Sequence, residues 1–291
     1  MLSYQHGFHA GNHADVLKHA VLCYVLDYLL QKDKPLLFFD THGGRGFYDL
    51  QHPMTQKTVE YRDGIARVWG RENTPAGLAP YLGALAALNE RKGLRYYAGS
   101  TRFARQLLRS TDRLLACELH PQEYLALRDN CASFTNVRVQ KEDGYVALKA
   151  ALPPVERRAA VLIDPSYELL SDDSAVVTAL REGLKRFAAG VFLLWYPVVD
   201  EKRARKLVKT VAALFAEASD EKVSAEKLLQ LELYVREPTV SGGGMAGSGM
   251  LVVNPPWQLE AAMREALPWL QQQLEVTEGS GRFVCRAPSG L

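Results

Sequence analysis

The amino-acid sequence predicts an α/β fold in which helices cover both faces of a mostly parallel sheet. Apart from one long gap, short apolar runs alternate with helical segments at intervals of roughly 20 to 30 residues, the pattern of strand–helix–strand units. The last two runs are joined by a glycine-rich link and predict an antiparallel edge. The predicted strands are Leu36–Asp40, Arg113–Glu118, Asn136–Asp143, Ala159–Asp164, Ala189–Pro197, Leu228–Val235 and Gly249–Asn254.

Helices are expected before, between and after these strands. In the first helix, Leu17, Val21 and Val25 recur on one face, which is the periodicity of a helix. The glycine-rich link Ser241–Gly249 leads into a strand and not into a helix, so we interpret it as a flexible loop near the substrate. The predicted helices are Ala14–Gln31, Pro121–Cys131, Gly144–Leu152, Ala175–Ala188 and Trp257–Leu274.

One interval is too long for a simple alternation. In dinucleotide-binding folds, ~20 residues separate the glycine turn from the acid that binds the ribose. Here 78 positions separate Asp40 from Glu118, and the excess contains two stretches of helical pattern. We therefore expect a Rossmann-like domain formed by residues 1–47 and 96–291, with a helical insertion at residues 48–95.

Composition excludes several classes of protein. The chain has 291 residues, 47% of them hydrophobic, which supports a large buried core. No apolar run approaches the ~20 residues that span a bilayer, and the four cysteines form no C-x-x-C pair. A reduced cytoplasmic protein is expected. The net charge of +2 permits a nucleic-acid partner without indicating one.

A glycine-rich turn follows the first strand. Asp40, His42, Gly44 and Gly46 form the pattern D-x-H-x-G-x-G, in which His42 takes the place of the first glycine of a pyrophosphate-binding fingerprint. A nicotinamide-dependent dehydrogenase would need the conventional fingerprint. The turn alone is equally compatible with a ligand site and with a tight strand–helix connection.

Acidic residues end four successive predicted strands. They are Asp40, Glu118, Asp143 and Asp164. In an open α/β sheet, ligands bind outside the carboxyl ends of the strands, although exposed acids are common there without a ligand. Glu118 can accept hydrogen bonds from a ribose, and Asp143, followed by Gly144, from an adenine amino group. The set favours S-adenosylmethionine, which carries adenine, ribose and an amino-acid tail but no phosphate.

The fourth of these strand ends continues as the tetrapeptide "DPSY". The amino nitrogen of adenine is a poor nucleophile, because its lone pair is delocalised into the ring. Two acceptors can orient that nitrogen: the carboxylate of Asp164, which can also take the released proton, and the carbonyl of Pro165, whose φ is fixed. The ring of Tyr167 can stack on a base that has swung out of its strand.

These motifs carry a resemblance to a known family. "DPSY" resembles the D/N-P-P-Y/F/W motif of adenine-N6 methyltransferases, and "DTHGGRG" resembles their cofactor loop. With "SYQHGFHAGNHADVLKH", "LLACELHP", "RRAAVLIDPSYE" and "SGMLVVNPPW", essentially the whole chain resembles the RlmJ family of bacterial 23S ribosomal RNA adenine-N6 methyltransferases. The resemblance implies a class I methyltransferase fold, S-adenosylmethionine as cofactor and 23S ribosomal RNA as partner. We expect a monomer.

The resemblance also implies roles for single residues. Ser166 stands where the family motif has a second proline, so Pro165 loses a conformational restriction, and we expect a looser loop and slower turnover. Asp164 matches the proton acceptor, Tyr4 matches a residue facing the target RNA, and His6 and Lys18 match residues near the base or RNA. The positions that match cofactor contacts are His19, His42, Ser100, Glu118, Asp143, Gly144 and Asp164.

Other features were weighed against this reading. The catalytic consensus is also matched, in residue types, by Asn254-Pro255-Pro256-Trp257. This tetrapeptide follows the last strand, so we interpret it as the end of that strand and the start of a helix. The histidines near the N-terminus lack metal-binding spacing, and no metal is expected. Five basic residues between Lys202 and Lys209 suit either phosphate contacts or a solvated helix face. A DNA adenine-N6 methyltransferase and an inert RNA-binding module remain alternatives.

Overall fold

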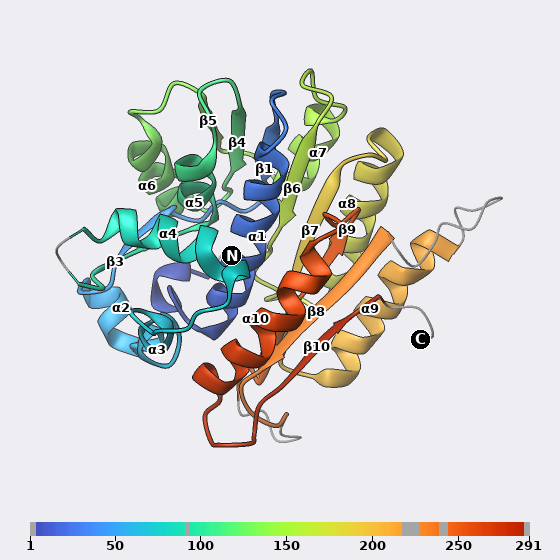
Figure 1. Cartoon of the computed structure of the whole chain (residues 1–291). Coiled ribbons are helices and arrows are strands. Elements are labelled where there is room, and N and C mark those ends of the chain that lie inside the picture. Colours follow the sequence, from blue (N-terminus) through green and yellow to red (C-terminus); the bar gives the residue numbers. More distant parts are fainter. Residues whose placement is uncertain (1–3, 91–92, 217–226, 239–243, 288–291) are drawn as a thin grey trace.

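The computed structural model describes residues 4–90, 93–216, 227–238 and 244–287. Eight strands form one sheet in the order β10-β8-β9-β7-β6-β1-β4-β5 (Figure 1). The first residues of the link Ser241–Gly249, expected to be a flexible loop, lie outside the described residues. The strands are β1 Leu37–Asp40, β4 Arg113–Cys117, β5 Val137–Gln140, β6 Ala159–Ile163, β7 Val191–Val198, β8 Leu228–Tyr234, β9 Gly247–Val253 and β10 Arg282–Arg286.

The strand directions confirm a mostly parallel sheet with an antiparallel edge. Strand β1 pairs in parallel with both β4 and β6, which in turn pair in parallel with β5 and β7. Strand β9 runs antiparallel between β7 and β8. The outer edge is β10, which the sequence reading missed because its run Arg282–Arg286 is short and has charged ends. The sheet is the predicted Rossmann-like sheet, mostly parallel with an antiparallel edge.

Helices cover both faces of the sheet and create two cores. Because side chains alternate along a strand, Phe38 of β1 joins the core on one face, and Leu37 and Phe39 join the core on the other. On the first face lie α1 His13–Leu30, α4 Ala79–Leu88, α5 Ser100–Leu107, α6 Pro121–Cys131 and α10 Leu259–Leu274. On the second lie α7 Gly144–Ala151, α8 Asp172–Arg186 and α9 Glu201–Ala216.

Helix α1 is buried on almost all sides in its N-terminal half. The side chain of Asn12 caps it by accepting hydrogen bonds from the backbone N–H groups of Ala14 and Asp15. Every residue from 14 to 23 is buried, because the helix packs against β7, β9, α4, α5 and α10. The predicted helix is present, but its burial extends beyond the face that carries Leu17, Val21 and Val25. Consequently Asp15, Lys18 and His19 are polar groups inside the protein.

The segment of residues 48–95 begins and ends beside a small two-stranded sheet. Strands β2 Phe47–Asp49 and β3 Tyr96–Ala98 pair antiparallel, and the N–H of Gly99 donates to the carbonyl of Gly46. The chain thus leaves the glycine turn and returns to the same place to begin α5, which explains the long interval in the sequence. Besides α4, the segment contains α2 Pro53–Thr58, η2 Glu60–Asp63, α3 Ile65–Val68 and η3 Ala76–Leu78.

The motif Asn254–Trp257 lies at the amino ends of the parallel strands. Strand β9 runs opposite to β7, so its last residue, Val253, pairs with Phe192 near the start of β7. The side-chain amide of Asn254 donates to the carbonyls of Ala188 and Gly190 at 2.8 and 2.7 Å. The motif therefore links the turn after β9 to the turn before β7, at the end of the sheet opposite the glycine turn. None of the described helices is long and apolar enough to cross a membrane.

Substitution Asn254→Ala should lower the free energy of unfolding by about 1–3 kcal/mol, because two backbone carbonyls lose their donor. The left-handed backbone of residue 254, with φ of 51°, adds strain for alanine. Urea denaturation measures the change. Trp257→Ala is the control, since this side chain is 77% exposed and should contribute little. Equal stability of Asn254→Ala and the unsubstituted protein would contradict this role.

Candidate active site

A cavity of ≈ 970 Å³ opens at the carboxyl ends of the parallel strands. It lies where β1 separates β4 from β6, which is the place in an open α/β sheet where ligands bind. The twelve residues that the "DPSY" motif and the family resemblance assigned to the site all line this cavity: Tyr4, His6, Lys18, His19, His42, Ser100, Glu118, Asp143, Gly144, Asp164, Pro165 and Tyr167. Asn254 and its neighbours in the second motif are absent from its described walls.

The glycine turn is held between the two strands that flank β1. The N–H of Thr41 donates to the carbonyl of Leu162 at 3.1 Å, and that of Gly43 donates to the carbonyl of Cys117 at 2.8 Å. Gly44 has φ of 55°, a left-handed conformation that glycine adopts without strain. Burial lowers the pKa of His42 to about 4, so its imidazole is neutral at physiological pH. The turn is a rigid, uncharged wall of the cavity.

Acceptors on one side of the cavity suit a nucleoside. The carboxylate of Glu118 accepts hydrogen bonds from the N–H groups of Gly44 and His120, at 2.9 and 2.7 Å, and burial raises its pKa. Asp143 caps α7 by accepting from the N–H of Tyr145 at 2.8 Å. At Gly144, a Cβ atom would lie 2.1 Å from the carbonyl oxygen of Thr41. Helix α7 can therefore approach the turn this closely only with glycine at its first residue.

Asp40 does not take part in this cavity, contrary to the reading of four ligand-facing acids. Its carboxylate is fully buried and accepts hydrogen bonds from the hydroxyls of Ser100 and Thr101, at 2.6 and 2.9 Å. Burial raises its pKa, and these hydroxyls partly offset the effect. Asp40 thus joins the end of β1 to the start of α5. Ser100 lines the cavity while its hydroxyl holds this buried acid.

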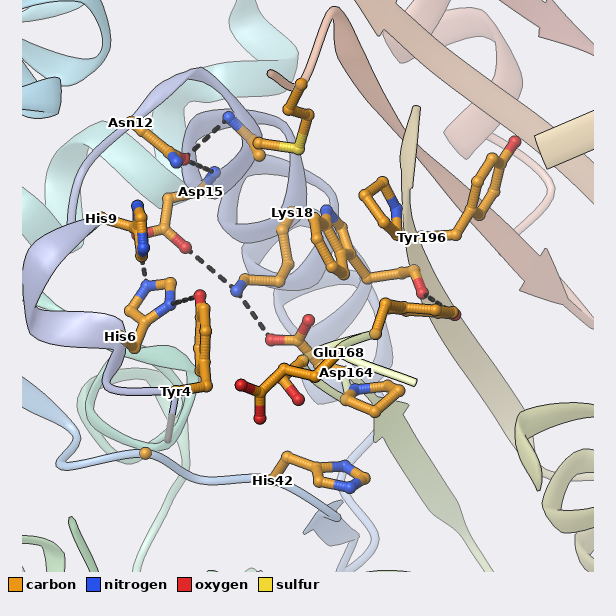
Figure 2. Close-up of a pocket in the computed structure, with 18 of the residues that line it drawn as sticks. Tyr4, His6, His9, Asn12, Asp15, Lys18, His42, Asp164, Glu168 and Tyr196 are labelled. Atoms are coloured by element: carbon orange, nitrogen blue, oxygen red, sulfur yellow. Dashed lines mark hydrogen bonds and ion pairs between the residues drawn. The ribbon is translucent and has the colours of Figure 1, made fainter. Parts of the chain in front are cut away.

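A buried lysine connects two carboxylates at the centre of the cavity. The ammonium of Lys18 lies 2.7 Å from Oδ2 of Asp164 and 3.0 Å from Oδ1 of Asp15 (Figure 2). Burial raises the pKa of Asp164 to about 6, and the charge of Lys18 opposes the rise. Burial alone would lower the pKa of Lys18, but the two carboxylates raise it above its usual value. The lysine therefore remains charged, although its side chain is only 6% exposed.

The N-terminal segment is attached to this lysine through Asp15. Nε2 of His6 lies 2.8 Å from Asp15, and Nδ1 of His6 lies 2.9 Å from the hydroxyl of Tyr4. Burial alone would raise the pKa of Asp15, but His6, Lys18 and His19 hold it well below its usual value. His9 binds a different carboxylate, that of Glu60. No three of the described His, Cys, Asp and Glu side chains converge as a metal site.

The sequence reading missed Asp15 as the centre of this cluster and did not foresee the ion pair of Lys18 with Asp164. The resemblance placed Lys18 near the base or RNA; the structure places it beneath the cavity surface, against Asp164. A signal existed in the sequence: Asp15, Lys18 and His19 are spaced i, i+3 and i+4, which puts them on one helix face.

The loop after Asp164 is anchored at Tyr167. The hydroxyl of Tyr167 donates to the carbonyl of Trp195 on β7 at 2.7 Å, and the two rings meet edge to face. Tyr167 has φ of 55°, which is uncommon for a bulky residue and indicates a conformation imposed by its surroundings. The ring is 8% exposed and lines the cavity with Pro165 and Ser166.

Comparison with known proteins identifies the family. A family model described as "Ribosomal RNA large subunit methyltransferase D, RlmJ" matches residues 33–286. The ribosomal RNA large subunit methyltransferases J of Escherichia coli and Haemophilus influenzae are 46% and 48% identical over 97% and 98% of this chain, and over 96% and 98% of their own. The chain belongs to the RlmJ family.

A solved structure shares the fold of this family member. The crystal structure of a protein from Legionella pneumophila has a TM-score of 0.86 and 36% identity, and the match covers 97% of this chain and 100% of that one. The present chain is thus a methyltransferase that modifies ribosomal RNA, and S-adenosylmethionine is its cofactor. The acceptors at Glu118 and Asp143 and the close approach of α7 at Gly144 fit this molecule.

Substitution Gly144→Ala should weaken cofactor binding, because the new Cβ would collide with the carbonyl of Thr41 and push α7 away from the turn. We expect the dissociation constant for S-adenosylmethionine, measured by calorimetry, to rise by about tenfold or more, since ~1.4 kcal/mol changes binding tenfold. Gly83→Ala is the matched control, as nothing lies within 4 Å of its added Cβ. Unchanged affinity in folded Gly144→Ala would refute the close-approach argument.

Proposed function

We propose that this ribosomal RNA methyltransferase transfers the methyl group to N6 of an adenine in 23S ribosomal RNA, at the "DPSY" motif. The observation that carries the proposal is the position of Asp164. Its carboxylate lies at the end of β6, beside the nucleoside-binding strand ends and in contact with Lys18. Pro165 follows it directly, so two acceptors lie on adjacent residues at the strand end. That is the arrangement an exocyclic amino group requires.

The cofactor side of the cavity is assigned to the strand-end acceptors. In the proposal, Glu118 holds the ribose hydroxyls and Asp143 with Gly144 holds the adenine. His42 and Gly44 form the wall of the turn, while His19 and Ser100 lie next to the amino-acid tail. His19 supports such a role, because its Nδ1 is bound by the hydroxyl of Tyr97 at 2.8 Å while its buried Nε2 has no hydrogen-bond partner among the described residues.

Bound S-adenosylmethionine supplies an electrophilic methyl group, and the chain prepares the nucleophile for it. One N–H of the adenine amino group donates to the carboxylate of Asp164, and the other donates to the carbonyl of Pro165. These two bonds direct the nitrogen lone pair away from the ring plane. As the bond between nitrogen and the methyl carbon forms, the bond from that carbon to sulfur breaks and its electron pair stays on sulfur. One N–H proton passes to Asp164, and the products are N6-methyladenine and S-adenosylhomocysteine.

Lys18 keeps Asp164 ready to accept that proton. It contacts only Oδ2, which leaves Oδ1 for the amino group. Without a neighbouring cation, a carboxyl buried this deeply would be protonated at neutral pH and could not accept. The positive charge of Lys18 counters this effect, so the carboxylate is ionised above about pH 6.

In the proposal, the target base lies between the N-terminal segment and the loop after Asp164. Tyr4 and His6 line the cavity on one side and Tyr167 lines it on the other. The aromatic ring of Tyr4 lies parallel to that of His9, with an interplanar angle of 7°, so this wall already favours stacking. An adenine that enters this space has to swing out of its base stack, since the cavity admits a single base and not a duplex.

The carboxylate assignment predicts the effect of Asp164→Asn. The amide keeps the shape but cannot take the proton, so methyl transfer to 23S ribosomal RNA should fall by about 100- to 10,000-fold. Cofactor affinity, measured separately, should change only a few-fold. Asn254→Ala, in the similar motif at the opposite sheet edge, should keep most of the activity. Nucleoside mass spectrometry of the RNA identifies the product.

Two results would count against the proposal. An Asp164→Asn enzyme with near-normal rates would remove the carboxylate from the mechanism. A methyl group on a base other than adenine, or on another atom of adenine, would exclude N6. Assays on equal amounts of 23S ribosomal RNA and duplex DNA separate the RNA enzyme from the DNA adenine-N6 alternative, and we expect transfer to the RNA.

The activity should depend on pH through Asp164. Its pKa is raised to about 6, so the acceptor form is lost as the pH falls through that value, and kcat/KM should fall with it. In Lys18→Met the opposing charge is gone, and the acid limb should move to higher pH. An acid limb near pH 4 in the unsubstituted enzyme, or an unmoved limb in Lys18→Met, would contradict the coupling of the two residues.

A further inference from the structure

Two neighbouring leucines project into solvent from the loop that follows Asp164. Leu169 is 63% exposed and Leu170 is 81% exposed. Single exposed apolar side chains are ordinary, but two adjacent ones on a loop tip form an apolar surface that water does not favour. The residues around them, Glu168, Asp172 and Asp173, all line the cavity. The pair therefore stands at the mouth of the site where the base would enter.

The loop that presents these leucines is held in place. The N–H of Leu169 donates to the carboxylate of Asp172 at 3.0 Å, and the N–H of Asp172 donates to the carbonyl of Leu169 at 3.1 Å. Arg203 of α9 binds the carboxylate of Asp173 through Nε and Nη2, at 2.7 and 2.9 Å, and its Nη2 also reaches the carbonyl of Leu169. These contacts restrain the backbone at Leu169, which lowers the entropy cost of inserting the tip into a partner.

Positive charge lies next to the apolar tip. Helix α9, whose first turn holds Arg203, carries Lys202, Lys206 and Lys209 at spacings of i, i+4 and i+7 on its exposed side. The opposite side of the helix, with Leu207 and Val208, is buried. In the described part of the chain, Arg203 and Arg205 have carboxylate partners, whereas the three lysines have none. An apolar tip beside a cationic stripe complements a base stack beside its phosphates.

We propose that Leu169 and Leu170 form a wedge that enters the RNA base stack at the step vacated by the target adenine. Lys202, Lys206 and Lys209 then contact flanking phosphates. The inference rests on the proposed function, since it requires an adenine that leaves its stack to reach Asp164. Apolar side chains that insert between base steps perform the same task in other nucleic-acid-binding proteins. The wedge would make the enzyme able to act on a target that is stacked and paired.

The test compares two RNAs that differ only at the partner of the target. One is the segment of 23S ribosomal RNA that carries the methylated adenine, with that adenine paired; the other has an abasic site opposite it. The double variant Leu169→Ala/Leu170→Ala should lose about tenfold or more in kcat/KM on the paired RNA and stay within about twofold on the abasic RNA. Val155→Ala is the matched control, since the Val155 side chain is also apolar and 86% exposed. Val155 precedes β6 and so lies at the amino ends of the parallel strands, away from the cavity.

The possible results separate the wedge from the proposed function. Equal activity of the double variant and the unsubstituted enzyme on both RNAs would overturn the wedge and leave the adenine assignment intact. An equal loss on both RNAs would also overturn it, because the leucines would then only shape the loop. Transfer by the unsubstituted enzyme to no adenine in either RNA would refute the proposed function itself, and the wedge with it.

A second measurement tests the lysine stripe. Replacement of Lys202, Lys206 and Lys209 by glutamine should weaken binding of both RNAs alike and reduce the slope of log affinity against log salt, because fewer counterions are released. The leucine variant should leave this slope unchanged. A salt slope that is identical in the lysine variant and the unsubstituted enzyme would show that α9 does not contact the phosphates and would overturn this part of the proposal.

Discussion

The ion pair between Lys18 and Asp164 is the constraint on which the site depends. It places a carboxylate inside the protein, beside the cavity, at a pKa low enough for ionisation at neutral pH. The same lysine binds Asp15, and Asp15 binds His6, so the charge at the reaction centre is connected to the N-terminal segment. Removing Lys18 would leave two carboxylates without their cation in the interior, which costs more than an exposed salt bridge contributes.

The fold supplies the positions that this chemistry needs. Helix α1 packs on the first face of the sheet and brings Lys18 to Asp164 at the carboxyl end of β6. Strands β1, β4 and β5 bring the glycine turn, Glu118 and Asp143 to the same end of the sheet. Because the N-terminal half of α1 is buried on nearly every side, the ammonium group of Lys18 cannot turn out into bulk solvent. On a helix with one solvent-exposed face, the Lys18 side chain could turn away from Asp164.

Most of the fold could be predicted because its signals are local. Apolar runs that end in an acid, glycine at the first turn and helical periodicity each involve neighbouring residues, and they identified the strands and their acidic ends. Tyr4, His6, Lys18, His19 and Ser100 were expected in the site only from the resemblance to the RlmJ family. The ion pair could not be found this way, since Lys18 and Asp164 are 146 positions apart. The inward orientation of the Asp40 carboxylate depends on hydrogen bonds from Ser100 and Thr101, which follow Asp40 by 60 and 61 positions. Strand β10 has too few apolar residues to stand out.

The most direct test is the modification state of 23S ribosomal RNA in cells with and without this gene. Digested RNA is analysed by mass spectrometry, and the fragment that changes is sequenced. The account predicts that one N6-methyladenine disappears without the gene and returns only when the gene encodes aspartate at position 164. An unchanged set of N6-methyladenines, or loss of a methyl group from any other atom of the RNA, would contradict it.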